Sequence, residues 1–153
     1  MIYWFTGQPG HGKTVQAQLL LEYINQGVPF YRRALHIDGD HLRALVENQD
    51  YSKAGRERNI QMAQTMAQFI NMNQMDVVVS LVAPYLELRE GFKEKLGNEL
   101  IEIYVHTDEL RGREQFHTDY EKPLDNFIDL CTSNETPEET HERLVNILAK
   151  YDI

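Results

Sequence analysis

The sequence predicts a three-layer α/β fold, in which a five-stranded parallel sheet is covered by helices on both faces. Two observations support this prediction. Short segments rich in β-branched and aromatic residues alternate with segments of helical periodicity, an order that favours parallel pairing through crossover helices. Residues 77–79 are three consecutive valines, a continuous apolar run typical of a strand that is covered on both faces. The 153 residues fit a single domain over residues 1–153.

The strands are expected where short β-branched or aromatic segments occur. The first of them, at residues 2–6, leads directly into a glycine-rich turn. In parallel sheets ligands bind beyond the carboxyl ends of the strands, so the residues that follow each strand are searched first for function. Five strands are predicted, at residues 2–6, 34–38, 76–81, 100–105 and 127–131.

The helices are expected where apolar residues recur at three- or four-residue spacing. In the first helix, apolar residues recur at helical spacing at Val15, Leu19 and Tyr23 and at Leu20 and Ile24. Gly27 is placed to end this helix. The last helix has a start signal in which Thr136 is the N-cap and Glu139 its capping-box partner. Helices are predicted at residues 15–25, 53–72 and 85–96 and from residue 137 onward.

The composition argues against several classes of protein. The net charge of −9 disfavours non-specific binding to nucleic acid, whose phosphate backbone repels an acidic surface. Cys131 is the only cysteine, so no internal disulfide forms and a reduced, cytoplasmic setting is expected. No apolar run approaches the roughly 18 residues of a membrane span. Residues 1–5 lack the basic region of a signal peptide.

A phosphate-binding motif follows the first predicted strand and opens the first predicted helix. The pattern G-x-x-x-x-G-K-[ST] is matched at every fixed position by Gly7, Gln8, Pro9, Gly10, His11, Gly12, Lys13 and Thr14. In such a P-loop, backbone amides and a helix N-terminus hold the phosphates of ATP. Lys13 then neutralises the β and γ phosphates, and the Thr14 hydroxyl binds Mg²⁺. A glycine-rich turn that only caps a helix explains neither residue. The motif therefore predicts a P-loop NTPase fold.

Polar residues at two other places are candidates for chemistry. Asp38 and Asp40 follow the second strand, where they can orient a metal-bound water or accept a proton from a substrate hydroxyl. The alternative is a turn in which Asp40 caps the next helix. Arg56 and Asn59 begin the long helix and share a face, since they are three residues apart. The alternative for this pair is an ordinary solvated helix surface.

Taken in order, these segments resemble the adenylylsulfate kinases (APS kinases). Residues 37–43, Ile-Asp-Gly-Asp-His-Leu-Arg, are similar to the family's L-D-G-D-N-[LIV]-R, and residues 51–60 to G-F-S…D-R-x-x-N-I. Residues 80–85 resemble S-x-I-S-P-Y, residues 103–107 resemble F/Y-V-D-T, and residues 120–123 match Y-E-x-P. The resemblance covers most of the chain, and its ordered series of motifs is more specific than any single one.

The resemblance implies a role for each matching residue. Lys13, Asp38 and Asp40 are the catalytic candidates, and Thr14 and Asp40 are the candidates for binding Mg²⁺. Arg113 is the candidate for a lid arginine on the ATP phosphates, with a surface ion pair as the alternative. The candidates for binding the acceptor are Asp40, Arg43, Tyr51, Arg56, Asn59, Val82, Ala83, Tyr85 and Phe116. For Tyr51 the alternative is a half-buried core aromatic.

Three departures from the family pattern occur. Ala83 stands at the position of the serine in S-P-Y, and His41 replaces an asparagine. The third departure is larger: about a dozen residues of the family's lid are absent between Arg113 and Tyr120. Because a lid covers both substrates and excludes water, its shortening bears on which acceptor is used.

The sequence thus predicts an ATP-dependent phosphotransferase, with adenylylsulfate as the first acceptor expected and Mg²⁺ as cofactor. In this reaction ATP and adenylylsulfate give ADP and 3′-phosphoadenylylsulfate, a step of sulfate assimilation. The family resemblance also implies a homodimer. One alternative is a kinase of the same fold that acts on another hydroxyl, in a nucleotide, a polynucleotide end or a sugar. The other is a nucleotide-binding module without catalysis, which Lys13, Thr14, Asp38 and Asp40 argue against.

Overall fold

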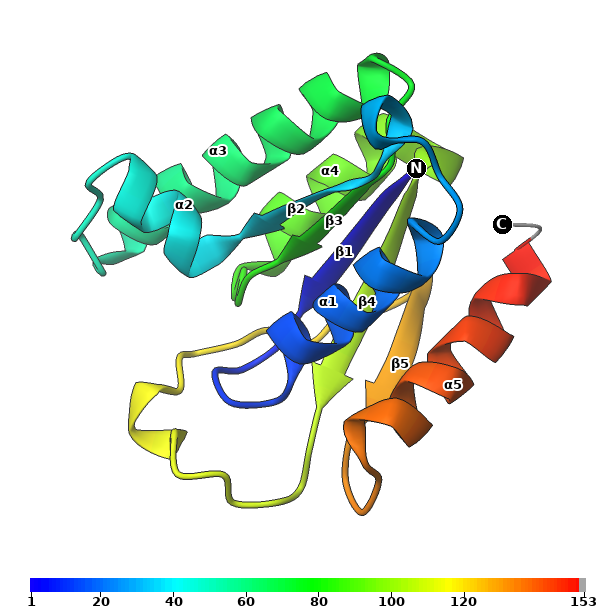
Figure 1. Ribbon diagram of the computed structural model, residues 1–153. Helices are drawn as coiled ribbons and strands as arrows, with labels where there is room; N and C mark the ends of the chain where they lie inside the picture. Colours follow the sequence, from blue (N-terminus) through cyan, green and yellow to red (C-terminus); the bar gives the residue numbers. More distant parts are fainter. Residues whose placement is uncertain (152–153) are drawn as a thin grey trace.

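The computed structural model describes residues 1–151 and contains the predicted parallel sheet between two helical layers (Figure 1). The strand order is β2-β3-β1-β4-β5, and every neighbouring pair is parallel. Each predicted strand is present, with bounds that shift by at most one residue at either end. The strands are β1 (Ile2–Thr6), β2 (Leu35–Asp38), β3 (Val77–Ser80), β4 (Leu100–His106) and β5 (Phe127–Cys131).

Two helices cover each face of the sheet. On one face lie α1 (Lys13–Ile24) and α5 (Pro137–Leu148), and on the other lie α3 (Lys53–Met72) and α4 (Leu86–Leu96) (Figure 1). A short helix, α2 (Gly39–Leu45), follows β2. The predicted capping box is confirmed at the start of α5, where Thr136 and Glu139 each accept a backbone hydrogen bond from the other.

The central strand supplies both hydrophobic cores. Ile2 and Trp4 point into the core beneath α3 and α4, whereas Tyr3 and Phe5 point into the core beneath α1 and α5. Successive residues of a strand face opposite sides of the sheet, so a strand covered on both faces is apolar throughout. This is why β1 and the valines of β3 carry no alternating polar residues.

Of the two apolar stripes predicted for α1, the one through Leu20 and Ile24 packs against the sheet, whereas Val15 and Tyr23 of the other stripe face outward. Val15 and Tyr23 are about half exposed, while Ala17 and Leu20 are fully buried against the sheet. The helix contains two overlapping stripes at helical spacing, and periodicity alone does not choose between them. The P-loop fixes the start of the helix at Lys13, and this starting point turns Ala17 and Leu20 inward.

All strands point toward one edge of the molecule, and the segments that follow them gather there (Figure 1). The P-loop follows β1, α2 follows β2, residues 81–85 follow β3, and a long connection spans residues 107–126 between β4 and β5. The long connection is called the lid below. Across residues 1–151, no helix has both the length and the apolar character that a membrane span requires.

Candidate active site

The P-loop motif forms a tight turn between β1 and α1. A side chain at Gly7 is excluded, because its Cβ would lie 2.1 Å from the carbonyl oxygen of Val105. Gly12 caps α1 in a left-handed conformation, with φ of 96°, that favours glycine. These two glycines let the chain curl so that amides and the helix N-terminus face the same space, the arrangement that binds phosphate.

Lys13 lies beneath this turn and is only 8% exposed. Its Nζ donates a hydrogen bond to the Gln8 carbonyl oxygen at 2.7 Å. Burial lowers the pKa of Lys13 to about 8; the carboxylates of Asp40 and Asp38 oppose the shift, and the nearby Arg113 adds to it. A buried cation with few partners is stabilised by an anion, so the position suits a phosphate.

Asp38 is held by four hydrogen bonds at the end of β2. Its Oδ1 accepts from the backbone amides of Asp40 (3.0 Å) and His41 (3.2 Å), and its Oδ2 accepts from the hydroxyls of Thr14 (3.0 Å) and Ser80 (3.0 Å). Burial acts to raise the pKa of Asp38, but these hydrogen bonds lower it below its ordinary value. The contacts also correct one reading of the turn: Asp38, rather than Asp40, caps the helix that follows.

A wide cleft of about 1390 Å³ extends from the P-loop toward α2 and the start of α3. Most of the residues predicted for the site line it, although they come from five separate segments of the chain. The predicted residues that line it are Pro9, Gly10, Gly12, Lys13, Thr14, Asp38, Asp40, Arg43, Tyr51, Arg56, Asn59, Val82, Ala83, Arg113 and Phe116.

Four predicted residues do not line the cleft. Gly7 and His11 belong to the P-loop turn itself, and the side chain of Gln8 is turned toward the lid. Tyr85 is the N-cap residue of α4 and packs against the core beneath α3 and α4. Its ring lies 5.5 Å from Nζ of Lys53 rather than beside the other acceptor candidates.

The end of the cleft away from the P-loop contains two arginines and an aromatic ring. Nη1 of Arg43 donates to the carbonyl oxygens of Asn48 (3.2 Å) and Asp50 (3.0 Å), and its guanidinium lies 4.4 Å from the centre of the Tyr51 ring. The Arg56 side chain forms no ion pair or hydrogen bond with residues 1–151. A guanidinium without a partner in a cleft is suited to an anionic ligand.

The lid is tied to the P-loop by a side chain that sequence reasoning did not single out for this role. Gln8 donates from Nε2 to the Thr118 carbonyl oxygen at 2.7 Å and accepts from the Thr118 amide at 2.9 Å. Arg113 packs against Gly10, where a Cβ would lie 2.9 Å from the arginine Cβ. Its guanidinium is 5.5 Å from the centre of the Phe116 ring. The short lid therefore places an arginine beside the P-loop and an aromatic ring next to the guanidinium of that arginine.

A second contact that sequence reasoning missed anchors the end of the lid. The buried Arg89 on α4 pairs with Glu102 through Nε at 2.8 Å and donates to the carbonyl oxygens of Ala83 and Glu121. Its guanidinium also lies 4.9 Å from the centre of the Tyr120 ring. Arg89 thus holds together the segment that follows β3 and the part of the lid that returns to β5.

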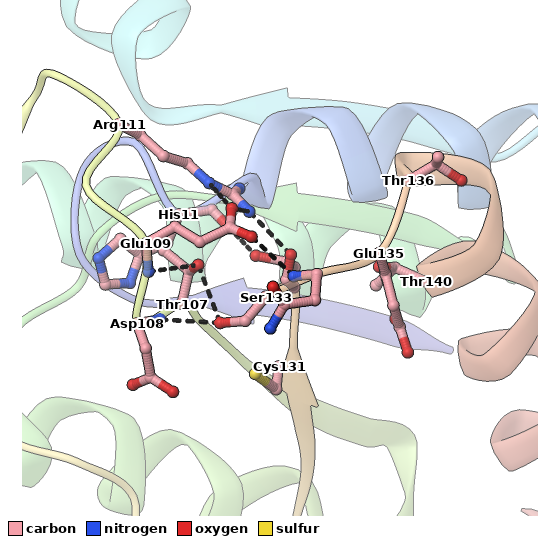
Figure 2. A network of polar contacts seen from close by, with 12 residues as sticks. His11, Thr107, Asp108, Glu109, Arg111, Cys131, Ser133, Glu135, Thr136 and Thr140 are labelled. Atoms are coloured by element: carbon pink, nitrogen blue, oxygen red, sulfur yellow. Dashed lines mark hydrogen bonds and ion pairs between the residues drawn. The ribbon is translucent and has the colours of Figure 1, made fainter.

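A polar brace secures the start of the lid behind the P-loop (Figure 2). Arg111 forms an ion pair with Glu109 at 2.8 Å and donates to the carbonyl oxygen of Thr132 at 2.8 Å. The Thr132 hydroxyl donates in turn to the carbonyl oxygen of His11 at 3.1 Å. Asp108 donates its amide to the Ser133 hydroxyl at 2.8 Å. The brace connects both the lid and the P-loop to the segment after β5.

The oxygen donors near the P-loop fit a divalent metal that arrives with a nucleotide. Thr14 and Asp40 are exposed beside the half-buried Asp38, and Thr14 and Asp38 are in contact. Mg²⁺ is usually bound by one or two carboxylates together with phosphate oxygens and water. Residues 1–151 contain no group of three or more histidine, cysteine, aspartate or glutamate side chains that could hold a metal ion. The donor set thus matches a metal that is completed by phosphates.

Residues 1–141 match the family described as adenylylsulphate kinase. The chain is 28% identical to a probable adenylyl-sulfate kinase of Pyrococcus abyssi over 162 aligned positions, which cover 93% of this chain and 91% of that protein. It is 30% identical to the cytidine diphosphoramidate kinase of Campylobacter jejuni over 142 positions, which cover 90% and 81%. The fold resembles the Mycobacterium tuberculosis APS kinase in complex with AMPPNP and APS, with a TM-score of 0.76, 20% identity, and coverage of 97% of this chain and 96% of that one.

The two alignments differ in how many of their positions have no counterpart in this chain. The P. abyssi alignment has 162 positions but takes up 93% of the 153 residues, about 142, so about 20 positions have no counterpart here. The C. jejuni alignment has 142 positions and takes up 90% of the chain, about 138 residues, so only about 4 positions lack a counterpart. Within the aligned region the chain therefore has fewer gaps against the second relative, of which the alignment covers 81%, against 91% of the first.

Proposed function

Because the chain belongs to the adenylylsulfate kinase family, whose members are ATP-dependent kinases, we propose that it transfers the γ-phosphate of ATP to the 3′-hydroxyl of adenylylsulfate. The observation that carries the proposal is the single cleft that joins the P-loop to Arg43, Arg56 and Asn59. The P-loop suits the phosphates of ATP, and the two guanidinium groups suit a second anionic group. A phosphosulfate provides such a group.

The phosphate end of the cleft is assigned as follows. Lys13 and the P-loop amides neutralise the β and γ phosphates, and Arg113 contributes a further positive charge from the lid. Thr14, backed by Asp38, is the protein ligand of Mg²⁺. When bound, the metal neutralises charge on the β and γ phosphate oxygens.

Asp40 is assigned as the group that accepts the proton of the acceptor hydroxyl. The sequence does not decide which of Asp38 and Asp40 is the base, and it predicts Asp40 as a ligand of Mg²⁺. Asp38 already accepts four hydrogen bonds, which makes it a poor base. Asp40 is exposed, lines the cleft and lies close enough to Lys13 to affect its pKa, so it can face both substrates.

At the far end, Arg56 and the remaining donors of Arg43 bind the anionic group of the acceptor. Tyr51 and Phe116 are both largely exposed at the cleft and are assigned to stack on the acceptor base. Asn59 is buried, and its Nδ2 donates to the Gly39 carbonyl oxygen at 3.4 Å, a contact that connects α3 to the start of α2.

A second acceptor, cytidine diphosphoramidate, is favoured by one observation. Within the aligned regions, about 20 positions of the P. abyssi relative have no counterpart in this chain, but only about 4 positions of the C. jejuni cytidine diphosphoramidate kinase. Both acceptors are nucleotides in which a phosphate carries a second group, so the cations of the cleft serve either one. The lid and the base-stacking rings are the parts expected to discriminate between them.

The test measures ADP release with MgATP alone, with adenylylsulfate and with cytidine diphosphoramidate, using Lys13→Ala as the blank. Strong stimulation by adenylylsulfate alone supports the first acceptor, and strong stimulation by cytidine diphosphoramidate alone replaces it with the second. Stimulation by neither, with ATP binding intact, overturns both assignments and moves the search to other hydroxyl acceptors.

A further inference from the structure

A histidine outside the proposed catalytic set is connected to it by hydrogen bonds. Nε2 of His36 lies 2.8 Å from the Ser80 hydroxyl, which lies 3.0 Å from Oδ2 of Asp38. His36 and Asp38 are two residues apart on β2, so their side chains share one side of the sheet. Ser80 ends the neighbouring strand β3 and pairs in register with Asp38. His36 precedes the segment, residues 37–43, that resembles the family motif.

The direction of each hydrogen bond follows from the groups involved. An ionised carboxylate only accepts, so the single hydroxyl proton of Ser80 is donated to Asp38. The serine oxygen is then left to accept, and the proton in the first bond must belong to Nε2 of His36. This holds whether the imidazole is neutral or charged, because Nε2 carries a proton in both cases.

The same carboxylate oxygen also orients the P-loop threonine. Oδ2 of Asp38 accepts the hydroxyl proton of Thr14 at 3.0 Å, which leaves the lone pairs of the threonine oxygen free for a metal ion. Ser80 is 1% exposed, so water does not compete readily for its hydroxyl. The chain of donors runs from His36 through Ser80 to Asp38, where it meets the donor from Thr14.

We propose that His36 is a positioning residue for the metal–nucleotide complex, which acts through Ser80 to hold the Asp38 carboxylate against the Thr14 hydroxyl. Without the histidine donor, the Ser80 hydroxyl can turn away from Asp38, and the carboxylate loses one of the contacts that fix it. Replacing a residue that hydrogen-bonds to a metal ligand commonly lowers metal affinity or activity 10- to 100-fold. Because His36 acts indirectly, we expect its loss to weaken binding about tenfold. This inference rests on ATP-dependent kinase function and is independent of the acceptor.

The test compares three substitutions by calorimetric binding of AMPPNP, with and without Mg²⁺. His36→Leu removes the donor and is expected to weaken binding about tenfold in Mg²⁺ while leaving metal-free binding unchanged. His36→Gln is expected to restore tight binding, because its amide nitrogen is as many bonds from Cβ as Nε2 of histidine. His36→Asn is too short to reach Ser80 and should behave as His36→Leu does.

A double-mutant cycle tests whether the effect passes through Ser80. Ser80→Ala should weaken AMPPNP binding in Mg²⁺ about as much as His36→Leu does. Adding His36→Leu to Ser80→Ala should weaken this binding no further. Equal weakening with and without Mg²⁺, independent losses for the two positions, or no difference between the Gln and Asn variants would overturn the proposal. Thermal melts accompany each variant, and the Gln and Asn pair still decides the question if His36→Leu fails to fold.

The wild-type protein separates two kinds of failure. If wild-type binding of AMPPNP shows no dependence on Mg²⁺, then the metal-dependent kinase proposal fails and the role of His36 fails with it. If the wild type responds to Mg²⁺ and His36→Leu responds to the same extent, only the role of His36 is overturned.

Discussion

The two ends of the cleft are built differently. At the phosphate end, Lys13 is 8% exposed and Asp38 accepts four hydrogen bonds, so these groups are fixed before any ligand binds. At the acceptor end, Tyr51 is 63% exposed and Phe116 57%, and Arg56 has no side-chain partner among the described residues. The difference indicates that the phosphate end is preorganised, whereas the acceptor end is completed by its ligand.

This contrast has a physical basis in the fold. The phosphate end is formed by a turn in which close packing against Val105 of β4 leaves room only for glycine at position 7. The acceptor end is formed by the connection between α2 and α3 and by the lid, which carry few buried side chains. A P-loop can therefore serve many kinases, while the acceptor end is where specificity changes.

The largest effect is expected at the preorganised end. Lys13→Ala removes the buried cation from the transferring phosphate and is expected to lower kcat by about 100- to 1,000-fold. The measurement is acceptor-dependent ADP release. Lys95→Ala is the matched control, since its side chain pairs with Gln68 on the outer helical layer. If Lys13→Ala lowers kcat by less than threefold, the assignment of the phosphate site is contradicted.

The next effect separates the two aspartates. Asp40→Asn removes the proposed base and is expected to lower kcat about 100-fold with little change in stability. Asp38→Asn keeps a good helix N-cap but removes the charge, so it is expected to weaken the response of nucleotide binding to Mg²⁺. Titrations of rate against free Mg²⁺ distinguish the two. If Asp40→Asn alters the Mg²⁺ response and Asp38→Asn alters only the rate, the two roles are exchanged.

A smaller effect is expected at the acceptor end. Tyr51→Ala removes one stacking ring and should raise the KM for the acceptor about tenfold, with kcat and the KM for ATP little changed. Leu110→Ala is the control, because Leu110 is 87% exposed and does not line the cleft. An equal rise in both KM values would show that Tyr51 supports the cleft as a whole rather than the acceptor alone.

The smallest effect concerns the proton on Lys13. Its pKa is lowered to about 8 in the free protein, and a bound phosphate is expected to raise it again. Binding of AMPPNP near pH 8 should therefore take up as much as about half a proton, and affinity should fall as pH rises above 8. Calorimetry in buffers of different ionisation enthalpy measures the uptake. Lys13→Ala should show none, and equal uptake in both proteins would place the titrating group elsewhere.

The same pKa affects folding stability with a definite sign. Between pH 8 and the ordinary lysine value near 10.5, the unfolded chain binds a proton that the folded chain does not. The unfolding free energy of the ligand-free protein therefore receives a contribution that rises with pH across this window, and Lys13→Ala removes it. Below pH 8 the charged lysine lowers stability until an anion binds.

The sequence by itself determined the strands, the P-loop and most of the residues that line the cleft. These features depend on local chain geometry: glycines at fixed offsets, apolar runs and a capping box each act within a few residues. The alternation of strands and helices also placed the strand ends together, because the connections in a parallel sheet bring all carboxyl ends to one edge. The assignment of Arg43 and Arg56 to one site came instead from the family resemblance, before their contacts were known.

Only the tertiary structure decided which side chains meet across that edge. Ser80 bonds to Asp38, 42 residues away, because β2 and β3 are neighbours, and Gln8 bonds to Thr118, 110 residues away, because the lid returns over the P-loop. Local patterns carry no information on such pairs, since strand order and the path of a loop are set by the packing of the whole chain. For the same reason, packing against the sheet decided which of the two apolar stripes of α1 is buried: Leu20 is in the core and Val15 is not.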